Sequence, residues 1–201
     1  MHLYYFPSAM PAQVSELIKV VSLFYPVPVQ AQEFLRQHCV VKAYKKGEYL
    51  LRPGEVCTTY HFIYQGVIRA FIRQDEKEVT TWISCANEIV TSIYSMHERT
   101  PSIEYIQVIR EAVLVELSAD KLEELLELVP EMNILIRRLL TAYYQDAEIR
   151  SFIARIPSAA ARCRYYLDVY AEKAPLIPKK YIASFLGIRE ETLSRMLHKA
   201  K

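Results

Sequence analysis

The sequence predicts an α+β protein, in which an antiparallel β-sandwich or barrel is followed by one long helix and a small helical domain. Three observations predict this fold class. Short segments with alternating apolar residues occupy residues 40–117, apolar residues recur at helical spacing after about residue 118, and residues 179–197 have the spacing of a helix-turn-helix. The chain has 201 residues, 52% of them apolar, which is enough to bury a core of this size.

The predicted strands are short and rich in β-branched and aromatic residues. Turn sequences such as Arg52-Pro53-Gly54 and Gln65-Gly66 separate them, as in an antiparallel sandwich or barrel. We expect strands at residues 40–44, 49–51, 60–64, 67–72, 79–83, 103–109 and 111–117. Only four glycines occur in the chain, so each is expected at a position that requires one.

Helical segments are predicted before and after the strands. They span residues 11–24, 29–37, 118–128, 131–156 and 158–170. Ser118 can cap the third of these helices, and Pro130 allows a new first turn to begin. Pro157 ends the long helix, because proline removes a backbone donor from the helix interior.

The long helix at residues 131–156 carries two apolar stripes. One stripe has alternating spacings of four and three residues: Leu135, Leu139, Ala142, Asp146, Ile149, Ile153 and Ile156. A neighbouring stripe consists of Met132, Ile136 and Tyr143. Two stripes predict two contacts, one with the barrel and one with the same helix of a second chain. The alternative is a helix buried wholly against its own domain, because Asp146 and the short repeat weaken the coiled-coil interpretation.

Charge is distributed unevenly along the chain. Residues 1–149 contain 14 basic and 19 acidic residues, whereas residues 150–201 contain 11 basic and 4 acidic residues. A basic C-terminal region attached to an acidic body favours a polyanionic partner, of which nucleic acid is the commonest. A basic face that serves solubility only is the alternative.

Composition also bears on location. No uncharged stretch reaches the roughly 20 apolar residues that span a bilayer, and the N-terminus lacks the cationic start of a secretory signal. Cys39, Cys57, Cys85 and Cys163 form no C-x-x-C pair and are predicted to be reduced core residues. We therefore expect a cytoplasmic protein without a membrane partner.

The most specific motif lies at residues 179–197. Its apolar residues can close a small core between two crossed helices: Ile182, Leu186, Ile188, Leu193 and Met196. Ala183 is small where the helices approach each other, and Gly187 can adopt the positive φ of the turn. Pro178 suits the first helical position. A generic helical hairpin, the alternative, would match only some of these positions.

The motif resembles the helix-turn-helix of the Crp/Fnr superfamily of bacterial transcription regulators. The resemblance is carried by Ile182-Ala183-Ser184, Leu186-Gly187-Ile188 and Glu191-Thr192-Leu193-Ser194-Arg195. The N-terminal half agrees, because two of its stretches resemble the opening of that superfamily's cyclic-nucleotide-binding barrel: Lys46-Gly47-Glu48 with Leu50 and Gly54, and Phe62-Ile63 with Gly66 and Arg69. The resemblance covers the chain from about residue 38 to its end.

This resemblance implies a fold and a function. It implies a β-roll or jelly-roll sensor domain at residues 1–128, a dimerisation helix at residues 129–156 and a helix-turn-helix DNA-binding domain at residues 157–201. It also implies a homodimer that reads a palindromic operator in double-stranded DNA under the control of an effector in the barrel. RNA polymerase is a further expected partner.

The positions that hold a cyclic nucleotide in the superfamily differ here. The turn that carries Gly-Glu in nucleotide-binding members is Asn87-Glu88-Ile89, and the family's arginine position falls at Ser102, with Arg99 three residues earlier. A cyclic phosphate needs a fixed cation or several amide donors. Cyclic AMP is therefore not the expected effector, and the effector stays unidentified. The candidate pocket residues are Glu88, Thr91, Arg99 and Ser102, for which a surface turn and a solvated loop are the alternative.

Other chemistries lack the residues that they need. An iron-sulfur cluster requires a cysteine cluster, and His61 and His97 have no recognisable partner for a haem. A cupin-like metal enzyme requires a His-x-His pair, and no Ser-His-Asp arrangement stands out. We therefore expect no metal, no cofactor and no enzymatic activity.

The resemblance places the DNA contacts at the second helix and its flanks: Lys179, Lys180, Arg189, Glu191, Ser194, Arg195 and Lys199. Glu191, Ser194 and Arg195 share one helical face. Because the chain ends at Lys201, the β-hairpin wing of many members is expected to be missing. Glu190 stands where a basic or neutral residue is common, so the alternative is a sensor or interaction module that no longer binds DNA.

Overall fold

The computed structural model describes residues 11–199. Its strands are β1 (Val40–Tyr44), β2 (Tyr49–Leu51), β3 (Thr59–Gln74), β4 (Lys77–Cys85), β5 (Ile89–Val90) and β6 (Tyr105–Ser118). Its helices are α1 (Ala12–Val21), α2 (Val29–His38), α3 (Ile93–Glu98), α4 (Ala119–Leu128), α5 (Met132–Arg155), α6 (Ala159–Val169), the 3₁₀ helix η1 (Ala174–Leu176), α7 (Lys179–Leu186) and α8 (Glu190–Lys199).

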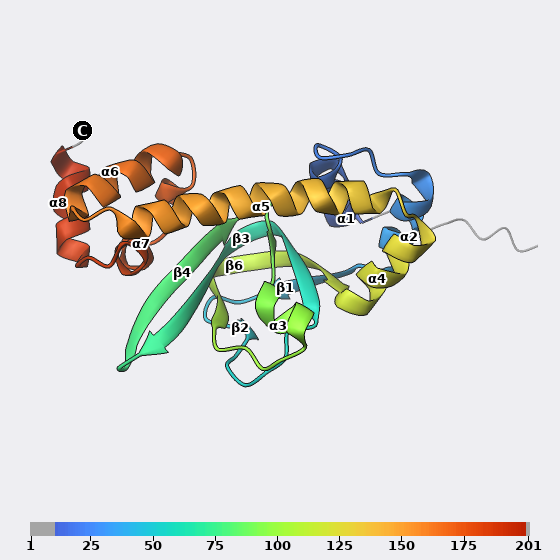
Figure 1. The fold of residues 1–201 in the computed structure, drawn as a ribbon, viewed down its shortest axis with the longest axis horizontal. Helices are drawn as coiled ribbons and strands as arrows, with labels where there is room; N and C mark the ends of the chain where they lie inside the picture. The colour runs from blue at the N-terminus through green and yellow to red at the C-terminus, as the bar shows by residue number, and fades with distance from the viewer. Residues whose placement is uncertain (1–10, 200–201) are drawn as a thin grey trace, which may run out of the picture.

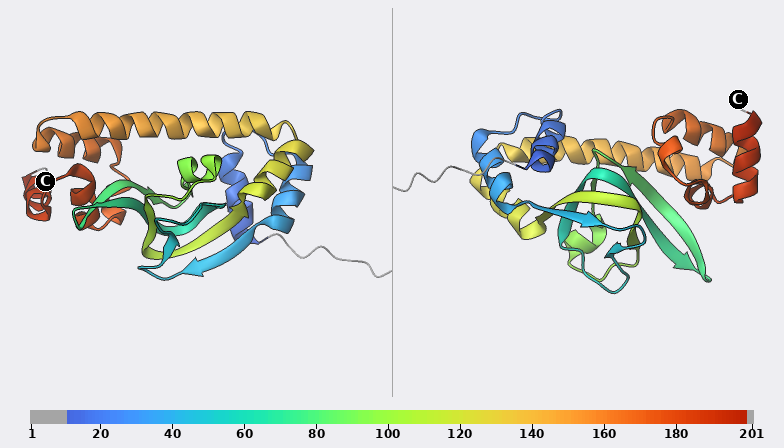
Figure 2. Two further views of the ribbon diagram at one scale, coloured as in Figure 1. Left: turned by 60° about the horizontal axis from the view of Figure 1, so that its bottom comes forward. Right: turned by 180° about the vertical axis from the view of Figure 1, so that it is seen from behind.

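The long helix α5 runs alongside the barrel of strands, with other helices gathered at both of its ends (Figure 1). Helices α1, α2 and α4 lie at its N-terminal end, and α6, α7 and α8 lie at its C-terminal end. The two further views show the same arrangement (Figure 2). The structure is therefore elongated along α5, with the C-terminal helices at one extreme.

The strands form one antiparallel sheet. Its order is β1-β6-β3-β4, with β2 also paired to β6 and β5 also paired to β3. The α+β class and the antiparallel sheet that the sequence predicts are thus confirmed. The sheet closes around a cluster of almost fully buried residues that includes Ile63, Ile68, Ile106 and Leu114.

The sequence analysis expects a turn at Gly66 between two strands, but the structure has no turn there. β3 continues through it as one strand, and the pairing with β6 shifts between Gln65 and Val67. Gly66 has a φ of 113°, and a Cβ atom there would lie 2.6 Å from the Cβ of Ala112. Glycine is therefore required for a close approach inside a bent strand. The two strands predicted at residues 103–117 are likewise the single strand β6.

The hairpin that joins β3 to β4 turns at Asp75 and Glu76. Both residues have positive φ, 48° and 61°, as a type I′ turn requires, although neither is glycine. β4 pairs only with β3, so it forms one edge of the sheet. This edge faces the C-terminal helices.

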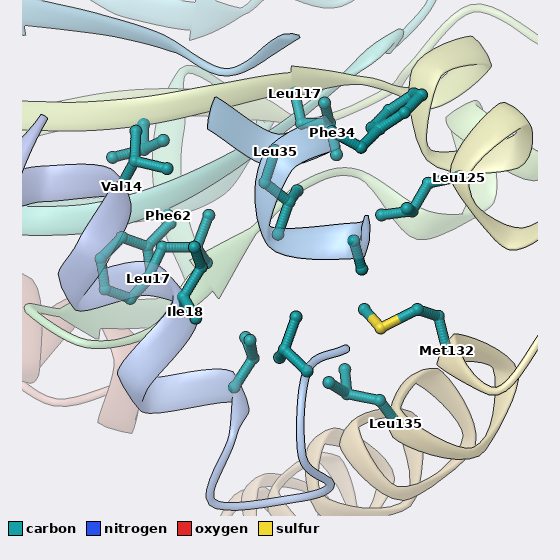
Figure 3. Packing of buried hydrophobic residues seen from close by; sticks show 14 of the residues in the cluster. Val14, Leu17, Ile18, Phe34, Leu35, Phe62, Leu117, Leu125, Met132 and Leu135 are labelled. Carbon is teal, nitrogen blue, oxygen red and sulfur yellow. The ribbon is translucent and has the colours of Figure 1, made fainter. Parts of the chain in front are cut away.

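A core of helices closes the end of the barrel near the N-terminus of α5. Figure 3 shows Leu17 and Ile18 of α1, Leu35 of α2 and Leu135 of α5 pointing toward one another. The side chain of Phe62 brings β3 into the same cluster. The predicted short helices thus pack on the barrel.

Short elements that the sequence analysis did not predict are β5, α3 and η1. β5 and α3 lie between β4 and β6, and η1 lies between α6 and α7. Within residues 11–199, no helix is long and apolar enough to cross a membrane.

Candidate functional site

The segment predicted to be a helix-turn-helix consists of α7 and α8 joined at Gly187. Gly187 is left-handed, with a φ of 62°, and its amide donates to the carbonyl of Ser184 at 3.2 Å. The amide of Ile188 donates to the carbonyl of Ala183 at 3.0 Å. These two bonds form a Schellman motif, which satisfies the last carbonyls of α7 and reverses the chain direction. The positive φ expected of Gly187 is therefore present.

Apolar residues of α7 and α8 pack together as their spacing predicts. Ile182, Leu186 and Leu193 are buried, and Ile188 and Met196 are half-buried in the same cluster. Cys163 and Tyr166 of α6 belong to the same buried cluster. The apolar side of α8 is thus fixed, so its opposite side faces outward.

Three residues on the outward side of α8 are the predicted reading face. Glu191 and Arg195 are exposed and Ser194 is half-buried, whereas Leu193 between them is fully buried. The Nε of Arg195 donates to the backbone oxygen of Glu191 at 3.4 Å. The guanidinium therefore stays close to its own helix and retains other donors for a ligand.

Basic residues flank this face. Lys179 and Lys180 are exposed in the first turn of α7, and Arg189 is exposed immediately before α8. Glu190 is also exposed, in the first turn of α8, where an acid stabilises the helix dipole. The side chain of Lys199, another predicted contact, lies outside the described residues.

The four candidate pocket residues of the barrel have separate partners within the chain. Glu88 accepts a hydrogen bond from the amide of Cys85 at 3.2 Å and forms an ion pair with Lys173, beyond α6. Arg99 follows α3 with a φ of 50° and forms an exposed ion pair with Asp120 of α4 at 3.3 Å. Glu88 and Arg99 therefore pair with different parts of the chain, the turn after α6 and the start of α4.

Thr91 and Ser102 make local contacts. The hydroxyl of Thr91 donates to the carbonyl of Thr59 at 3.1 Å. Ser102 is buried, and its hydroxyl accepts from the amide of Glu104 at 3.0 Å and donates to the carbonyl of the same residue at 3.1 Å. These bonds order the chain on either side of α3. They use both hydroxyl groups within the chain.

A carboxyl group that sequence reasoning missed lies beside this segment. Glu104 is half-buried, and the hydroxyl of Ser92 donates to its Oε1 at 2.6 Å. Burial raises the pKa of Glu104, and hydrogen bonds from Ser92 and Trp82 oppose that rise. Donors that could bind a ligand are thus used by the chain's own carboxyl group.

A second buried polar cluster surrounds Glu116 of β6. The Tyr44 hydroxyl donates to Glu116, the Nζ of Lys42 lies 2.7 Å from its Oε2, and the Nε2 of His61 lies 3.7 Å from its Oε1. Burial lowers the pKa of His61, and the charge of Glu116 opposes that change. The alternation along β6 could have revealed this cluster, because Glu116 shares a face with the core residue Leu114.

These residues do not fit a cyclic phosphate. The buried guanidinium of Arg69 is bonded to Gln107 and paired with Glu78, and Lys42 is paired with Glu116. An anionic ligand that used the buried Arg69 would have to displace its partners, at a cost in buried charge. We therefore derive no binding step for a cyclic nucleotide.

One face of α5 is apolar and uncovered. Leu140, Tyr144 and Phe152 are 46%, 66% and 56% exposed. A shallow groove on this face is lined by Asn133, Ile136, Arg137, Leu140, Thr141 and Tyr144. The stripes that the sequence analysis describes include Ile136 but none of the three exposed apolar residues. Burial of Met132, Leu135 and Ile153 shows that those stripes face the chain's own cores.

Comparison with known proteins identifies one family over part of the chain. Residues 41–128 match the family of cyclic nucleotide-binding domains. No curated protein matches the chain. The matched range runs from β1 to the end of α4, so it contains the whole barrel and leaves out α5 to α8.

Solved structures match over most of the chain. FixK2 from Bradyrhizobium japonicum has a TM-score of 0.70 at 14% identity, over 80% of this chain and 83% of that one. The c-di-GMP responsive global regulator CLP from Xanthomonas campestris has a TM-score of 0.67 at 16% identity, over 86% and 91%. A chain described as a transcriptional regulator of the Crp/Fnr family from Eubacterium rectale has a TM-score of 0.63 at 17% identity, over 86% and 83%.

At these identities the likeness concerns the fold. Coverage of 80% or more of the chain exceeds residues 41–128, so the likeness includes part of the chain outside the barrel. Residues 41–128 therefore resemble cyclic nucleotide-binding domains, and the fold of the chain resembles the folds of these solved structures.

Proposed function

We propose that this chain is a DNA-binding transcription regulator of the Crp/Fnr type that acts as a homodimer on a palindromic operator. The observation that carries this proposal is the geometry of α7 and α8. Their packing buries Leu193 and leaves Glu191, Ser194 and Arg195 on an outward face of α8, within the basic C-terminal region. An exposed polar face opposite a fixed core is what a helix needs to enter the major groove.

Each residue of this face has a defined chemistry toward base edges. Arg195 can donate two bonds to the O6 and N7 of guanine, and Glu191 can accept from the amino group of cytosine. Ser194 tolerates several edges. The exposed Lys179, Lys180 and Arg189 at the flanks would contact phosphates and supply affinity without sequence preference.

A second copy of the chain is the proposed occupant of the uncovered face of α5. A palindromic site presents two half-sites about 34 Å apart, so one reading helix per half-site requires two chains. The exposed Leu140, Tyr144 and Phe152 would be covered by the same helix of the partner. RNA polymerase stays a predicted partner of the complex on DNA.

The effector of the barrel stays unidentified. The altered turn at Asn87 and Glu88 and the paired state of the buried Arg69 argue against a cyclic nucleotide. Regulation would then depend on a different ligand or on the concentration of the protein itself.

One observation favours a second candidate, a sensor or interaction module that does not bind DNA. Glu190 and Glu191 are both exposed at the start of α8, where they would repel phosphates. The dipole of the helix stabilises the same acids, so their presence also has a purely structural cause.

Selection from a randomised duplex pool distinguishes the two candidates. The full chain is immobilised, bound duplexes are amplified over several rounds, and their sequences are compared. The proposal predicts an enriched motif with two inverted half-sites whose centres lie about 10 base pairs apart. Recovered sequences that stay random, with retention that depends only on salt, would favour the module without DNA recognition.

A further inference from the structure

The joint between the C-terminal helices and the edge of the barrel is made by one side chain of α7. β4 is the edge strand, so its outward backbone groups have no neighbouring strand among the described residues. The hydroxyl of Ser184 donates to the carbonyl of Glu78 at 2.8 Å and accepts from the amide of Thr80 at 3.1 Å. The Oγ1 of Thr80 lies 3.1 Å from the same hydroxyl. Ser184 thus replaces a neighbouring strand at this point of the sheet.

A second contact lies one turn earlier on α7. The guanidinium of Arg69 is held between two rings, 4.0 Å from the centroid of Phe71 and 4.3 Å from that of Tyr181. Arg69 is only 3% exposed and also donates to Gln107 at 2.9 Å. Tyr181 therefore packs against a cation that the barrel already fixes in place.

Apolar contacts extend the joint. Ile177 and Ile182 share one buried cluster with Val67 of β3 and Ile109 of β6. A flexible tether between two independent domains would not produce a shared core. The α7–α8 pair therefore has a defined orientation relative to the barrel.

We propose that Ser184 is a positioning residue for DNA reading: through its bonds to β4 it fixes the direction of α8 relative to α5. This inference rests on the proposed function. Glu191 and Arg195 are exposed while the joint is closed, so the joint orients the reading face without covering it. In a dimer with flexible joints, the two α7–α8 pairs would lose conformational freedom when both half-sites are bound. A fixed joint removes that entropic cost before binding.

The variant Ser184→Ala tests the inference. Alanine is a better helix former than serine, so the change removes the hydroxyl and keeps α7 helical. Ser15→Ala is the matched control, because it makes the same change on the exposed side of α1, at the other end of the molecule. Both variants are made in the full chain.

Affinity is measured for two duplexes derived from the selection with the unaltered chain. One carries the full palindrome, and the other carries one intact and one scrambled half-site. Ser184→Ala should bind the full palindrome roughly tenfold more weakly and the half-site within about twofold of the unaltered chain. Ser15→Ala should match the unaltered chain on both duplexes. The amide of Thr80 should exchange its hydrogen faster in Ser184→Ala, because it loses its acceptor.

Three results would overturn the inference. Equal losses of affinity on the two duplexes would mean that Ser184 stabilises the α7–α8 pair itself. Unchanged affinity on both duplexes would mean that the hydroxyl does not orient the α7–α8 pair. Unchanged exchange at Thr80 would mean that the hydroxyl does not hold the edge of β4. Failure of the proposed function is distinct, because the unaltered chain would then select no motif at all.

Discussion

The guanidinium carbon of Arg69 lies 4.3 Å from the centroid of the Tyr181 ring. The two residues are separated by more than half of the chain and belong to β3 and α7. Their contact joins the barrel to the C-terminal helices. A change in the shape of the barrel near Arg69 would therefore move Tyr181 and the α7–α8 pair that carries the proposed DNA contacts.

This contact predicts a difference between two substitutions of Tyr181. Tyr181→Phe keeps the ring over the guanidinium, whereas Tyr181→Leu keeps an apolar side chain without a ring. The leucine variant should unfold with a free energy about 0.5–2 kcal/mol lower than the phenylalanine variant, because it loses the cation–π contact. Chemical denaturation of the two variants measures this difference. Equal stabilities would mean that Arg69 gains nothing from the ring.

The uncovered face of α5 predicts the oligomeric state. The double substitution Leu140→Asp with Tyr144→Asp places charge in the proposed interface and should convert a dimer into a monomer in sedimentation at micromolar concentration. The change Ile103→Asp is the control, because Ile103 is 81% exposed and lies on the barrel, between α3 and β6. A monomeric unaltered chain, or a double variant that stays dimeric, would contradict the interface. Ile153 is a poor choice for this test, because it is 1% exposed in the core with α6 and α7.

The buried cluster at His61 predicts a pH dependence of stability. Burial lowers the pKa of His61 from its ordinary 6.5, so the folded chain holds a neutral imidazole. Below pH 6.5 the unfolded chain binds the proton more readily, and the free energy of unfolding falls as the pH falls further. Above that pH this contribution is complete.

The substitution His61→Gln should remove this part of the pH dependence. Denaturation between about pH 5 and pH 7 should give a flatter profile for the variant than for the unaltered chain. A parallel pair of profiles would show that His61 does not titrate differently in the folded and unfolded states. The half-buried Glu104, whose raised pKa acts in the opposite direction, is present in both proteins and drops out of the comparison.

The barrel is expected not to bind cyclic AMP. Arg99 is engaged with Asp120 at the surface, and Arg69 is engaged with Glu78 and Gln107. Calorimetry should therefore show no saturable heat on titration of the nucleotide. Micromolar binding that Glu88→Ala abolishes would contradict this prediction.

Much of the fold follows from local patterns. β1 and β2 have the bounds that their alternation predicts, and the apolar spacing of α7 and α8 predicts their mutual core. Continuity of β3 through Gly66 could not be predicted, because it depends on the approach of Ala112 from a strand distant in sequence. The two-residue strand β5 and the six-residue helix α3 are too short to produce a periodic pattern of apolar residues.

Some features of the candidate site also follow from local spacing, whereas others depend on contacts between residues distant in sequence. Helical spacing alone places Glu191, Ser194 and Arg195 on one face, and Leu193 is buried opposite them. The bonds of Ser184 to β4 had no signal in the sequence, because they join residues more than 100 positions apart. The sequence analysis did not identify the exposed apolar residues Leu140, Tyr144 and Phe152 of α5. Apolar spacing along a helix predicts which residues are buried, but it does not show whether they pack against the same chain or against a second one.

The role of Arg195 in reading DNA is the central claim, and one equilibrium titration tests it most directly. The unaltered chain, Arg195→Ala and Lys179→Ala are each titrated with the selected palindrome and with a scrambled duplex over a range of salt concentrations. Arg195→Ala should lose about 1–3 kcal/mol on the palindrome alone, because its bidentate contact reads a base. Lys179→Ala should weaken both duplexes alike and reduce the salt slope by about one, because it contacts phosphate. A ratio of specific to non-specific affinity that Arg195→Ala leaves unchanged would contradict the account.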